Sequence, residues 1–210
     1  MPSSRFDEAA ATWDEQPARV ALARDIAKAV LVQVPVRSSM TAVDYGCGTG
    51  LLTLALRPAL RRIIGVDSSS GMLAKLQEKI QTAGVTDVET RLLDLEAQPP
   101  ADDVAADLIV SAMTLHHIAD LPKLLRAFHQ WLRPGGCLAL ADLDTEDGSF
   151  HQDAAGVHHF GVDRNWLAAQ LMELGLRDVR AATVHVIERP DGAGSLKRYP
   201  VFLVSAHKAG

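Results

Sequence analysis

Three glycines within five residues form the first pattern with chemical potential in this chain of 210 residues. Gly46, Gly48 and Gly50 stand between an apolar run that ends at Tyr45 and a helix-forming stretch that begins at Leu51. Because glycine has no Cβ, the backbone of such a turn can approach a ligand closely and can direct its N–H groups toward it. The spacing is G-x-G-x-G, whereas the dinucleotide fingerprint requires G-x-G-x-x-G. We therefore expect a ligand-binding loop that differs from the dinucleotide-binding loop.

Two acidic residues follow at the ends of the next apolar runs. Asp67 lies seventeen residues after Gly50, and its carboxylate could accept two hydrogen bonds from a ribose diol. Asp94 ends the following run, where its carboxylate could accept a hydrogen bond from the exocyclic amine of adenine. Each acid alone has a simpler explanation, because Asp67 could cap a helix that starts at Ser69 and Asp94 could hydrate a loop. Together with the glycine loop, the two acids favour a nucleoside-binding crevice.

Apolar runs alternate with amphipathic stretches from Thr41 onward, which is typical of a parallel sheet with helices on its faces. Five central strands, short and rich in Val, Ile and Leu, are expected at residues 41–45, 62–66, 88–92, 107–111 and 137–141. Ser69, Asp120 and Asp163 are expected to cap helices. The helix after Asp120 is expected to end at a turn over residues 133–136.

The two ends of the chain complete the expected fold. Residues 1–40 precede the first strand, and two helical pieces are expected there, around 7–13 and over 17–34. Near the other end, the apolar runs 179–187 and 201–206 flank a turn-rich segment at 190–194, which suits a terminal antiparallel hairpin. The whole pattern predicts a doubly wound α/β sheet with a hairpin at one edge.

The sequence resembles the class I S-adenosylmethionine-dependent methyltransferases through Val43-Asp44-Tyr45-Gly46-Cys47-Gly48-Thr49-Gly50, Asp67, Asp94 and Leu132-Arg133-Pro134-Gly135-Gly136. The resemblance covers roughly residues 41–143, about half of the chain. It implies a Rossmann-like methyltransferase fold with seven mostly parallel strands in the order 3-2-1-4-5-7-6, the last strand antiparallel. It also implies a single domain over residues 1–210, with S-adenosylmethionine as cofactor and S-adenosylhomocysteine as product.

The resemblance assigns parts of the cofactor to positions of this chain. It implies that the glycine turn wraps the methionine and adenosine parts, that Asp67 holds the ribose, and that Asp94 with Leu95 meets the adenine. Asp44 would face the amino end of the cofactor. The cofactor-binding residues expected in this way are Asp44, Gly46, Cys47, Gly48, Asp67, Ser68, Met72, Asp94, Leu95 and Ala112. Cys47 is not expected to act as a nucleophile, because a cysteine in this turn would point toward the cofactor or pack against it.

The methyl acceptor is expected beyond the carboxyl ends of the strands, where open α/β sheets bind their ligands. His116, after the fourth strand, could be a general base, although it could instead hydrogen-bond a loop carbonyl. Residues 142–162 are long enough for an acceptor-site loop, and residues 1–40 could fold over the cofactor as a lid. The expected substrate residues are Trp13, His116, His151, His159 and Tyr199. Trp13 could instead be core packing, and Tyr199 could belong to a hydrated hairpin tip.

Composition narrows the class of partner. The net charge is −5, and the 21 basic residues are scattered, which argues against nucleic acid or a membrane surface as the main partner. No Asn-Pro-Pro-aromatic or Pro-Cys motif follows the fourth strand, so a small-molecule acceptor is favoured. Histidines and carboxylates gather in 142–162, but no metal-ligand spacing recurs on one helix face, so no metal site is expected.

The cysteine content and the lengths of the apolar runs indicate the cellular location of the protein. Cys47 and Cys137 are too few and too far apart for a disulfide framework, and no apolar run is long enough to cross a membrane. We therefore expect a cytoplasmic protein, and a homodimer is left open. Two other functions stay open: a non-catalytic S-adenosylmethionine-binding protein of the same fold, and an NAD-dependent oxidoreductase. The displaced third glycine and the absence of Tyr-x-x-x-Lys speak against the oxidoreductase.

Overall fold

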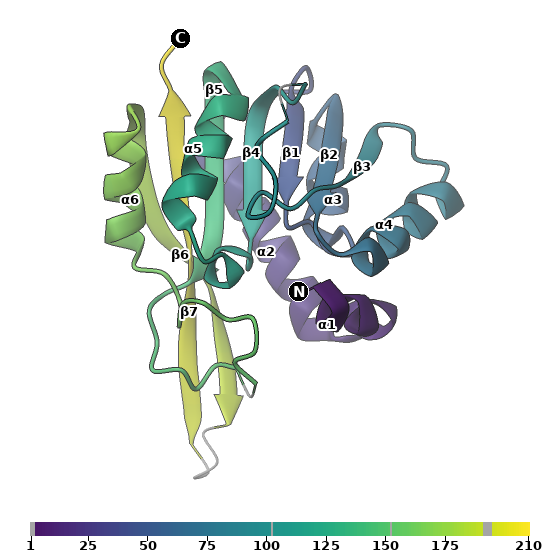
Figure 1. The fold of residues 1–210 in the computed structure, drawn as a ribbon, viewed down its shortest axis with the longest axis vertical. Coiled ribbons are helices and arrows are strands. Elements are labelled where there is room, and N and C mark those ends of the chain that lie inside the picture. Colours follow the sequence, from purple (N-terminus) through teal and green to yellow (C-terminus); the bar gives the residue numbers. More distant parts are fainter. Residues whose placement is uncertain (1–2, 102, 152, 191–194) are drawn as a thin grey trace.

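A seven-stranded sheet forms the centre of the molecule in a computed structural model that describes residues 3–101, 103–151, 153–190 and 195–210 (Figure 1). Its strand order is β3-β2-β1-β4-β5-β7-β6, and β7 runs antiparallel to both of its neighbours. The predicted strand order and the antiparallel last strand are therefore confirmed. The strands are β1 (Thr41–Tyr45), β2 (Arg62–Asp67), β3 (Val88–Leu92), β4 (Ala106–Ala112), β5 (Leu132–Leu143), β6 (Leu176–Pro190) and β7 (Leu196–Lys208).

Helices cover both faces of the sheet because the central strands are apolar on both sides. Every residue of β1 is buried, and its alternate side chains enter two separate apolar clusters. Helices α2, α3 and α4 contribute to one cluster, and α5 and α6 to the other. The helices are α1 (Ser3–Ala9), α2 (Pro17–Gln33), α3 (Leu51–Leu56), α4 (Ser70–Thr82), α5 (Leu121–Trp131) and α6 (Arg164–Glu173), and the 3₁₀ helices are η1 (Ala10–Glu15), η2 (Arg57–Ala59) and η3 (Leu115–His117).

The predicted helix caps are present. Ser69, Asp120 and Asp163 each accept a hydrogen bond from a backbone N–H in the first turn of α4, α5 and α6. These bonds satisfy donors that the helix itself cannot pair, which is why short polar side chains mark these positions in the sequence.

Three local predictions differ from the structure. The turn expected over residues 133–136 is a bulge inside β5, because the register against β4 jumps from Leu132 to Cys137 and Gly135 takes up the extra chain with a φ of +74°. The helix expected around 7–13 is α1 followed by the tighter η1. The hairpin strands β6 and β7 are longer than the apolar runs, since ladder bonds continue past them; residues 191–194 of the expected turn lie outside the described residues.

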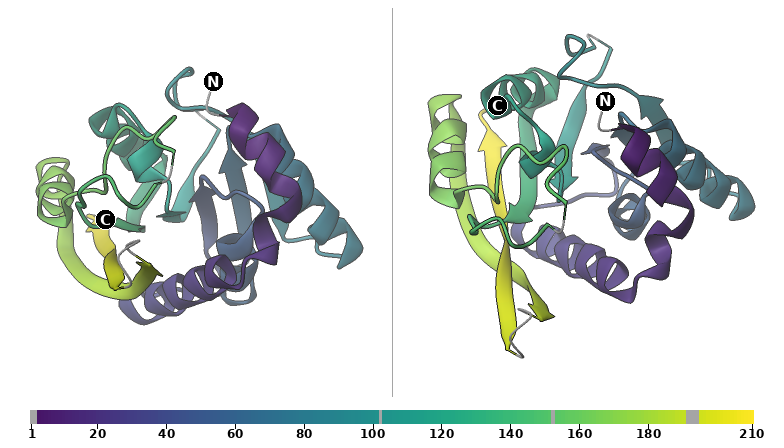
Figure 2. Two further views of the ribbon diagram at one scale, coloured as in Figure 1. Left: turned by 90° about the horizontal axis from the view of Figure 1, so that it is seen from below. Right: turned by 60° about the horizontal axis from the view of Figure 1, so that its bottom comes forward.

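Two covering segments lie at the edge where β1, β2 and β4 end. Figures 1 and 2 show α1 on one side of these strand ends and the loop between β5 and α6 on the other. The carboxyl ends of parallel strands are the ligand-binding edge of such sheets, so both segments stand over the expected site. Among the described helices, none is both long enough and apolar enough to cross a membrane.

Candidate active site

The glycine loop joins β1 to α3 and is fastened to the end of β2. The N–H groups of Gly46 and Cys47 both donate to the Val66 carbonyl, at 2.8 and 3.1 Å, and the Gly48 N–H donates to the Asp67 carboxylate at 2.7 Å. The prediction that the loop directs its N–H groups toward a ligand is therefore wrong for these three residues. They bind the neighbouring strand, and the loop can offer a ligand its bare Cα surface instead.

Two glycines of the loop are required for different reasons. Gly46 has a φ of +71°, and a Cβ there would lie 2.2 Å from Thr114 Oγ1. Gly48 has a φ of +53°, but a Cβ there would meet only Met72 Sδ, at 3.9 Å, among the described residues. Gly46 thus allows the glycine loop to pack closely against Thr114. Gly48 borders open space beside Met72, where a ligand could lie.

Asp67 ends β2 beside this space. Its two carboxylate oxygens accept the N–H groups of Gly48 and Ser69, at 2.7 and 2.8 Å. Burial raises the pKa of Asp67, and these N–H bonds oppose that rise. Each oxygen keeps a second lone pair, so Asp67 can hold the loop in place and still accept hydrogen bonds from a diol.

Asp44 is a buried carboxyl group in β1. The residue is only 1% exposed, and its carboxylate accepts a hydrogen bond from the Thr53 hydroxyl at 2.5 Å. Burial raises the pKa of Asp44 to about 7, the nearby Asp67 charge adds to the rise, and the Thr53 bond opposes it. A cationic group brought close to Asp44 would therefore favour its ionised form.

The other predicted cofactor residues fall around the same strand ends. Asp94 is half-buried and accepts the Glu96 N–H at 2.9 Å, which folds the chain after β3 into a turn. Ala112 is half-buried at the end of β4 and Ser68 is exposed beside Asp67, whereas the Leu95 side chain belongs to the apolar core. Leu95 could therefore contact a ligand mainly through its backbone.

Cys47 does not have the surroundings of a nucleophile. Its Sγ would lie 2.9 Å from a Cβ on Gly65, so the side chain packs against β2 within the core. Burial raises the pKa of the thiol well above its usual value. The thiolate form that nucleophilic attack needs is thus disfavoured.

His116 and Asp142 form a buried pair between the ends of β4 and β5. His116 Nδ1 lies 2.6 Å from Asp142 Oδ1, and the other carboxylate oxygen accepts the His116 N–H at 3.3 Å. Burial acts to raise the pKa of Asp142, but His116 and the Leu143 N–H outweigh it and the pKa is lowered. The carboxylate therefore selects the tautomer with the proton on Nδ1 and leaves Nε2 as the basic nitrogen.

Asp142 was not among the predicted site residues. It is the penultimate residue of β5, and Asp67 is the last residue of β2, so an acid near a strand end was the signal that could have revealed it. The segment before His116 is also unusual, because Met113 has a φ of +56°, a left-handed conformation that is costly for a side chain with a Cβ. Such strain is typical of functional sites.

Two more histidines lie against His116. The ring centroids of His117 and His151 are 4.1 and 5.0 Å from that of His116. Burial lowers the pKa of both His117 and His151 to about 4, and the neighbouring His116 adds to the effect. Both rings are therefore neutral at pH 7. His117 was not predicted as a site residue, because only its neighbour was singled out.

The acceptor-site loop is hydrogen-bonded to the segment that carries these rings. The N–H groups of His158 and His159 both donate to the His116 carbonyl, at 2.9 and 3.1 Å. His159 Nε2 lies 2.9 Å from the Ile118 carbonyl, so this imidazole is held by a loop carbonyl and is not in the histidine cluster. The structure thus brings His116 and His151 together. His159 instead helps to hold the acceptor-site loop against the segment that carries His116.

Trp13 and Tyr199 lie at the two ends of a continuous row of rings. Tyr199 is 4% exposed and bonds Ser149 through its hydroxyl, so it supports the row from behind. Successive ring centroids are 4.1 to 6.0 Å apart in the order Trp13, Phe6, His117, His116, His151, Phe150 and Tyr199. The rings come from the N-terminal segment, the segment after β4, the acceptor-site loop and β7, and together they form one aromatic wall.

Asp7 fastens helix α1 to the start of α4. Its Oδ1 accepts the Ser69 hydroxyl at 2.6 Å and the Gly71 N–H at 2.7 Å. These two bonds lower the pKa of Asp7. A Cβ on Gly71 would lie 2.8 Å from the Asp7 Cα, so only glycine allows this close contact between the two helices.

Two further contacts hold the N-terminal segment over the strand ends. Asp14 accepts the Thr49 hydroxyl at 2.5 Å and forms an ion pair with Lys79, which also donates to the Thr49 carbonyl. Arg5 pairs with Asp153 of the acceptor-site loop at 3.3 Å. The segment therefore connects the glycine loop, α4 and the acceptor-site loop.

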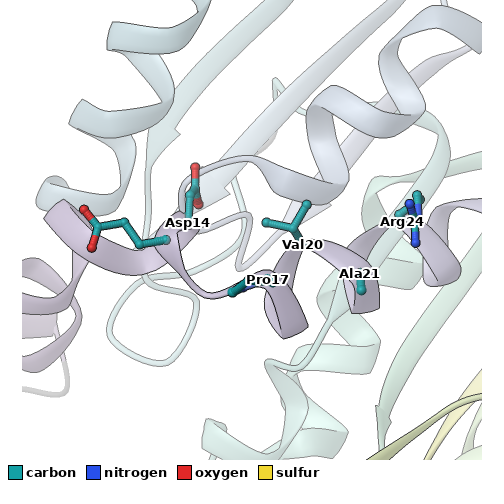
Figure 3. A pocket seen from close by; sticks show the side chains of 6 residues that line it. Asp14, Pro17, Val20, Ala21 and Arg24 are labelled. Atoms are coloured by element: carbon teal, nitrogen blue, oxygen red, sulfur yellow. The ribbon is translucent and has the colours of Figure 1, made fainter.

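Two depressions on the surface lie beside this segment and not at the histidines. The larger, of about 500 Å³, has Asp14 and Arg24 at opposite ends (Figure 3). Its remaining lining residues are Glu15, Pro17, Val20 and Ala21. The smaller, of about 170 Å³, is lined by Ala10, Ala11, Asp14, Thr49, Lys75, Glu78 and Lys79. Neither is lined by the strand-end acids or by the histidine cluster.

Comparisons with known proteins agree with this geometry. Residues 43–140 match a family described as a methyltransferase domain. The trans-aconitate 2-methyltransferase of Azoarcus sp. is 36% identical over 137 residues, which is 61% of this chain and 50% of that protein. The malonyl-[acyl-carrier protein] O-methyltransferase of Serratia marcescens is 30% identical over 161 residues, 75% of this chain and 60% of that protein.

A solved structure shows the same fold. The SAM-dependent methyltransferase from Aquifex aeolicus superposes with a TM-score of 0.68 at 21% identity, covering 96% of this chain and 97% of that one. The chain spans about half the length of the first curated relatives that it matches.

The strand order and the helices on both faces define a Rossmann-like α/β domain, a fold whose ligands bind at the carboxyl ends of the strands. Together with the match of residues 43–140 to a methyltransferase domain, this fold supports a class I methyltransferase that uses S-adenosylmethionine as cofactor, as the sequence resemblance implied.

Proposed function

We propose that this protein is a single-domain enzyme that transfers the methyl group of S-adenosylmethionine to a small-molecule acceptor. The observation that carries the proposal is the convergence of the glycine loop, Asp67 and the His116–Asp142 pair at one edge of the sheet. The space beside Gly48 and Met72 fits a nucleoside edge, since nothing else within 4 Å of a Cβ on Gly48 would obstruct it among the described residues.

The hydrogen bonds of the loop favour this donor over a dinucleotide. A pyrophosphate is bound by N–H groups at a helix start, but the N–H groups of Gly46, Cys47 and Gly48 are already paired with Val66 and Asp67. A sulfonium donor carries no phosphate and needs no such donors. The alternative of an NAD-dependent oxidoreductase is disfavoured for this reason.

The residues around the crevice have distinct tasks in the proposed reaction. Asp67 would accept hydrogen bonds from the ribose hydroxyls, and Asp94 would accept one from the adenine amine. Asp44 would attract the amino end of the cofactor. When bound, S-adenosylmethionine supplies an electrophilic methyl carbon: the acceptor lone pair forms the new bond while the carbon–sulfur bond breaks and its electron pair stays on sulfur. His116 Nε2 takes the acceptor proton, and Asp142 stabilises the resulting imidazolium.

Enclosure is the other contribution of the protein. The ring row and the N-terminal segment keep water away from the acceptor, and alignment of two bound reactants is the main requirement for a transfer of this kind. Trp13, His151 and Phe150 provide the apolar and aromatic wall. The relative named for trans-aconitate supports a metabolite acceptor, as does the net charge of −5, which disfavours nucleic acid. We propose a cytoplasmic location, because Cys47 and Cys137 are both free thiols, which suits a reducing compartment.

Cofactor binding gives the first test. Titration calorimetry should detect S-adenosylmethionine and S-adenosylhomocysteine binding but not NAD, and Asp67→Ala should weaken cofactor binding by about 10- to 100-fold. Asp103→Ala, at an exposed acid paired with Arg91, is the matched control and should leave the affinity unchanged. Stabilisation by NAD alone, or an unchanged affinity in Asp67→Ala, would contradict the proposal.

Product formation separates an enzyme from a non-catalytic binding protein of the same fold. A panel of carboxylic acids, phenols, thiols and amines should yield S-adenosylhomocysteine with at least one acceptor. His116→Ala should then lower kcat much more than it lowers cofactor affinity. Cofactor binding without turnover on any acceptor would favour the non-catalytic protein.

A further inference from the structure

The three neighbouring imidazoles have a geometry that the proton-transfer role of His116 does not explain. The ring nitrogens of His116, His117 and His151 that could act as ligands all lie within 4.8 Å of one another. They come from η3 and from the acceptor-site loop, which are distant in the sequence. No spacing rule along a helix could have found them, since the loop brings His151 to the other two.

Each ring has a nitrogen suited to bind an ion. His116 Nδ1 is engaged by Asp142 at 2.6 Å and His117 Nδ1 by the Gly156 carbonyl at 2.8 Å, so Nε2 is the available nitrogen of each. His151 Nδ1 is buried and has no hydrogen-bond partner within the part of the chain that the structure describes. A buried ring nitrogen without a partner is costly unless something binds it.

We propose that His116, His117 and His151 together bind one divalent transition-metal ion of the Zn²⁺ type at the acceptor end of the site. Imidazole is a preferred Zn²⁺ ligand, and three protein ligands leave one position of a tetrahedral ion for a substrate atom. The outer partners also fit, because histidines that bind metals usually donate their other N–H to a carboxylate or a carbonyl. Asp142 and Gly156 have these two roles.

The rings must move slightly to bind the ion. Zn–N bonds of about 2.0 to 2.1 Å place tetrahedral ligand nitrogens about 3.3 to 3.5 Å apart. Separations of up to 4.8 Å therefore have to shorten by about 1.3 to 1.5 Å, which side-chain rotations of His151 and His117 can provide. The hydrogen bonds of His116 hold its ring in place as the fixed ligand.

The ion would define the class of acceptor, and this part of the inference rests on the proposed methyl transfer. A hydroxyl or thiol at the open position would lose its proton to solvent, because a bound divalent ion lowers the pKa of such groups. His116 would then hold the ion and would no longer take the proton itself. The preferred acceptor would carry an ionisable oxygen or sulfur beside the transferred methyl group.

Metal binding can be measured without any turnover. The full chain, stripped with a chelator, should bind one Zn²⁺ per chain in titration calorimetry, and Co²⁺ should give the visible absorption of a four-coordinate nitrogen site. His117→Ala and His151→Ala should each weaken Zn²⁺ binding by at least about 100-fold, and Asp142→Asn by about 10- to 100-fold. His158→Ala is the matched control, because its exposed ring lies outside the cluster and its backbone N–H makes the bond to His116.

The outcomes distinguish this inference from the proposed function. Absent Zn²⁺ binding by the folded wild-type chain overturns the metal site, and binding that survives in both His117→Ala and His151→Ala shows an adventitious ion and also overturns it. If cofactor binding and transfer persist without the ion, the methyltransferase proposal stands alone. If Zn²⁺ binds to the three histidines while S-adenosylmethionine does not bind, the metal site stands and the proposed function fails. Circular dichroism checks that each variant is folded, and the Co²⁺ spectrum of the wild type decides the question if a variant is not.

Discussion

Two acids near the carboxyl ends of β1 and β5 differ in protonation because their partners differ. Asp44 and Asp142 are equally buried, yet burial raises the pKa of Asp44 to about 7, whereas His116 and backbone donors keep the pKa of Asp142 low. Among the described residues, the groups that stabilise the charge of Asp44 are the hydroxyl and the backbone N–H of Thr53. The same residue type is thus a neutral or ionised group depending on which donors the fold supplies.

The stability of the protein should report the state of Asp44. Its pKa in the folded chain, about 7, is above the unfolded value of 3.8, so its stabilising contribution is complete below about pH 4 and is lost as the pH rises through 7. Asp44→Asn keeps an acceptor for Thr53 but cannot ionise. The free energy of unfolding of Asp44→Asn, relative to wild type, should therefore increase by about 2 to 3 kcal/mol between pH 5 and pH 8. Urea unfolding at both pH values measures this, and a difference that does not change with pH would contradict the assignment.

At the scale of elements, the glycine loop is a junction between β1, β2 and the segment after β4. Its N–H groups bind the end of β2, and Gly46 lies directly against Thr114. The loop is therefore held by the sheet itself and does not depend on a ligand for its shape. A preformed loop of this kind lowers the cost of ordering the chain when the cofactor binds.

A pair of glycine substitutions separates backbone strain from close packing. Gly46 and Gly84 both have positive φ, +71° and +61°, but a Cβ on Gly84 would meet nothing within 4 Å among the described residues. Gly84→Ala should cost about 1 to 2 kcal/mol of unfolding free energy, from left-handed strain alone. Gly46→Ala should cost about 1 to 3 kcal/mol more of unfolding free energy than Gly84→Ala, because its Cβ clashes with Thr114. It should also weaken cofactor binding. If chemical denaturation gives the same loss of unfolding free energy for both variants, the Thr114 side chain moves aside at little cost and the close-packing explanation is wrong.

For the whole molecule, the main feature is closure of the strand ends by segments from both sides. The N-terminal segment holds α4 through Asp7 and the glycine loop through Asp14, and Arg5 connects it to the acceptor-site loop. Figure 2 shows how these segments flank the ends of the strands. A ligand buried beneath them can enter and leave only when such contacts open.

The contacts of Asp7 should control this opening. Asp7→Ala removes the acceptor for the Ser69 hydroxyl and the Gly71 N–H, a loss comparable to that of a helix cap, about 0.5 to 2 kcal/mol. Hydrogen exchange in residues 5–13 should then be about 2- to 30-fold faster, and cofactor release should accelerate with it. Glu8→Ala, at an exposed position of the same helix, is the control and should change neither rate. Unchanged exchange in Asp7→Ala would mean that other contacts hold the segment.

Much of the fold could be predicted from local patterns. The strands around 41–45 and 88–92 and the caps at Ser69, Asp120 and Asp163 matched because burial on two faces and unpaired helix donors act over a few residues. The bulge in β5 could not be predicted, because Pro134 and two glycines suit a turn and a bulge equally well. The edge that we propose for the cofactor was also predicted from local signals, since the glycine loop directly follows β1 and Asp67 ends β2.

The amino-acid sequence alone indicated the strands, the helix caps and the glycine loop, because periodicity and capping residues are local signals, and its resemblance to a known family implied the order of the strands. Only the tertiary structure decided which donors each carboxyl group meets, that His151 joins His116 and His117, and that Asp7 and Asp14 hold the N-terminal segment in place. These contacts join residues far apart in the chain. Their pairing depends on how the loops pack in three dimensions, and no short-range pattern encodes it.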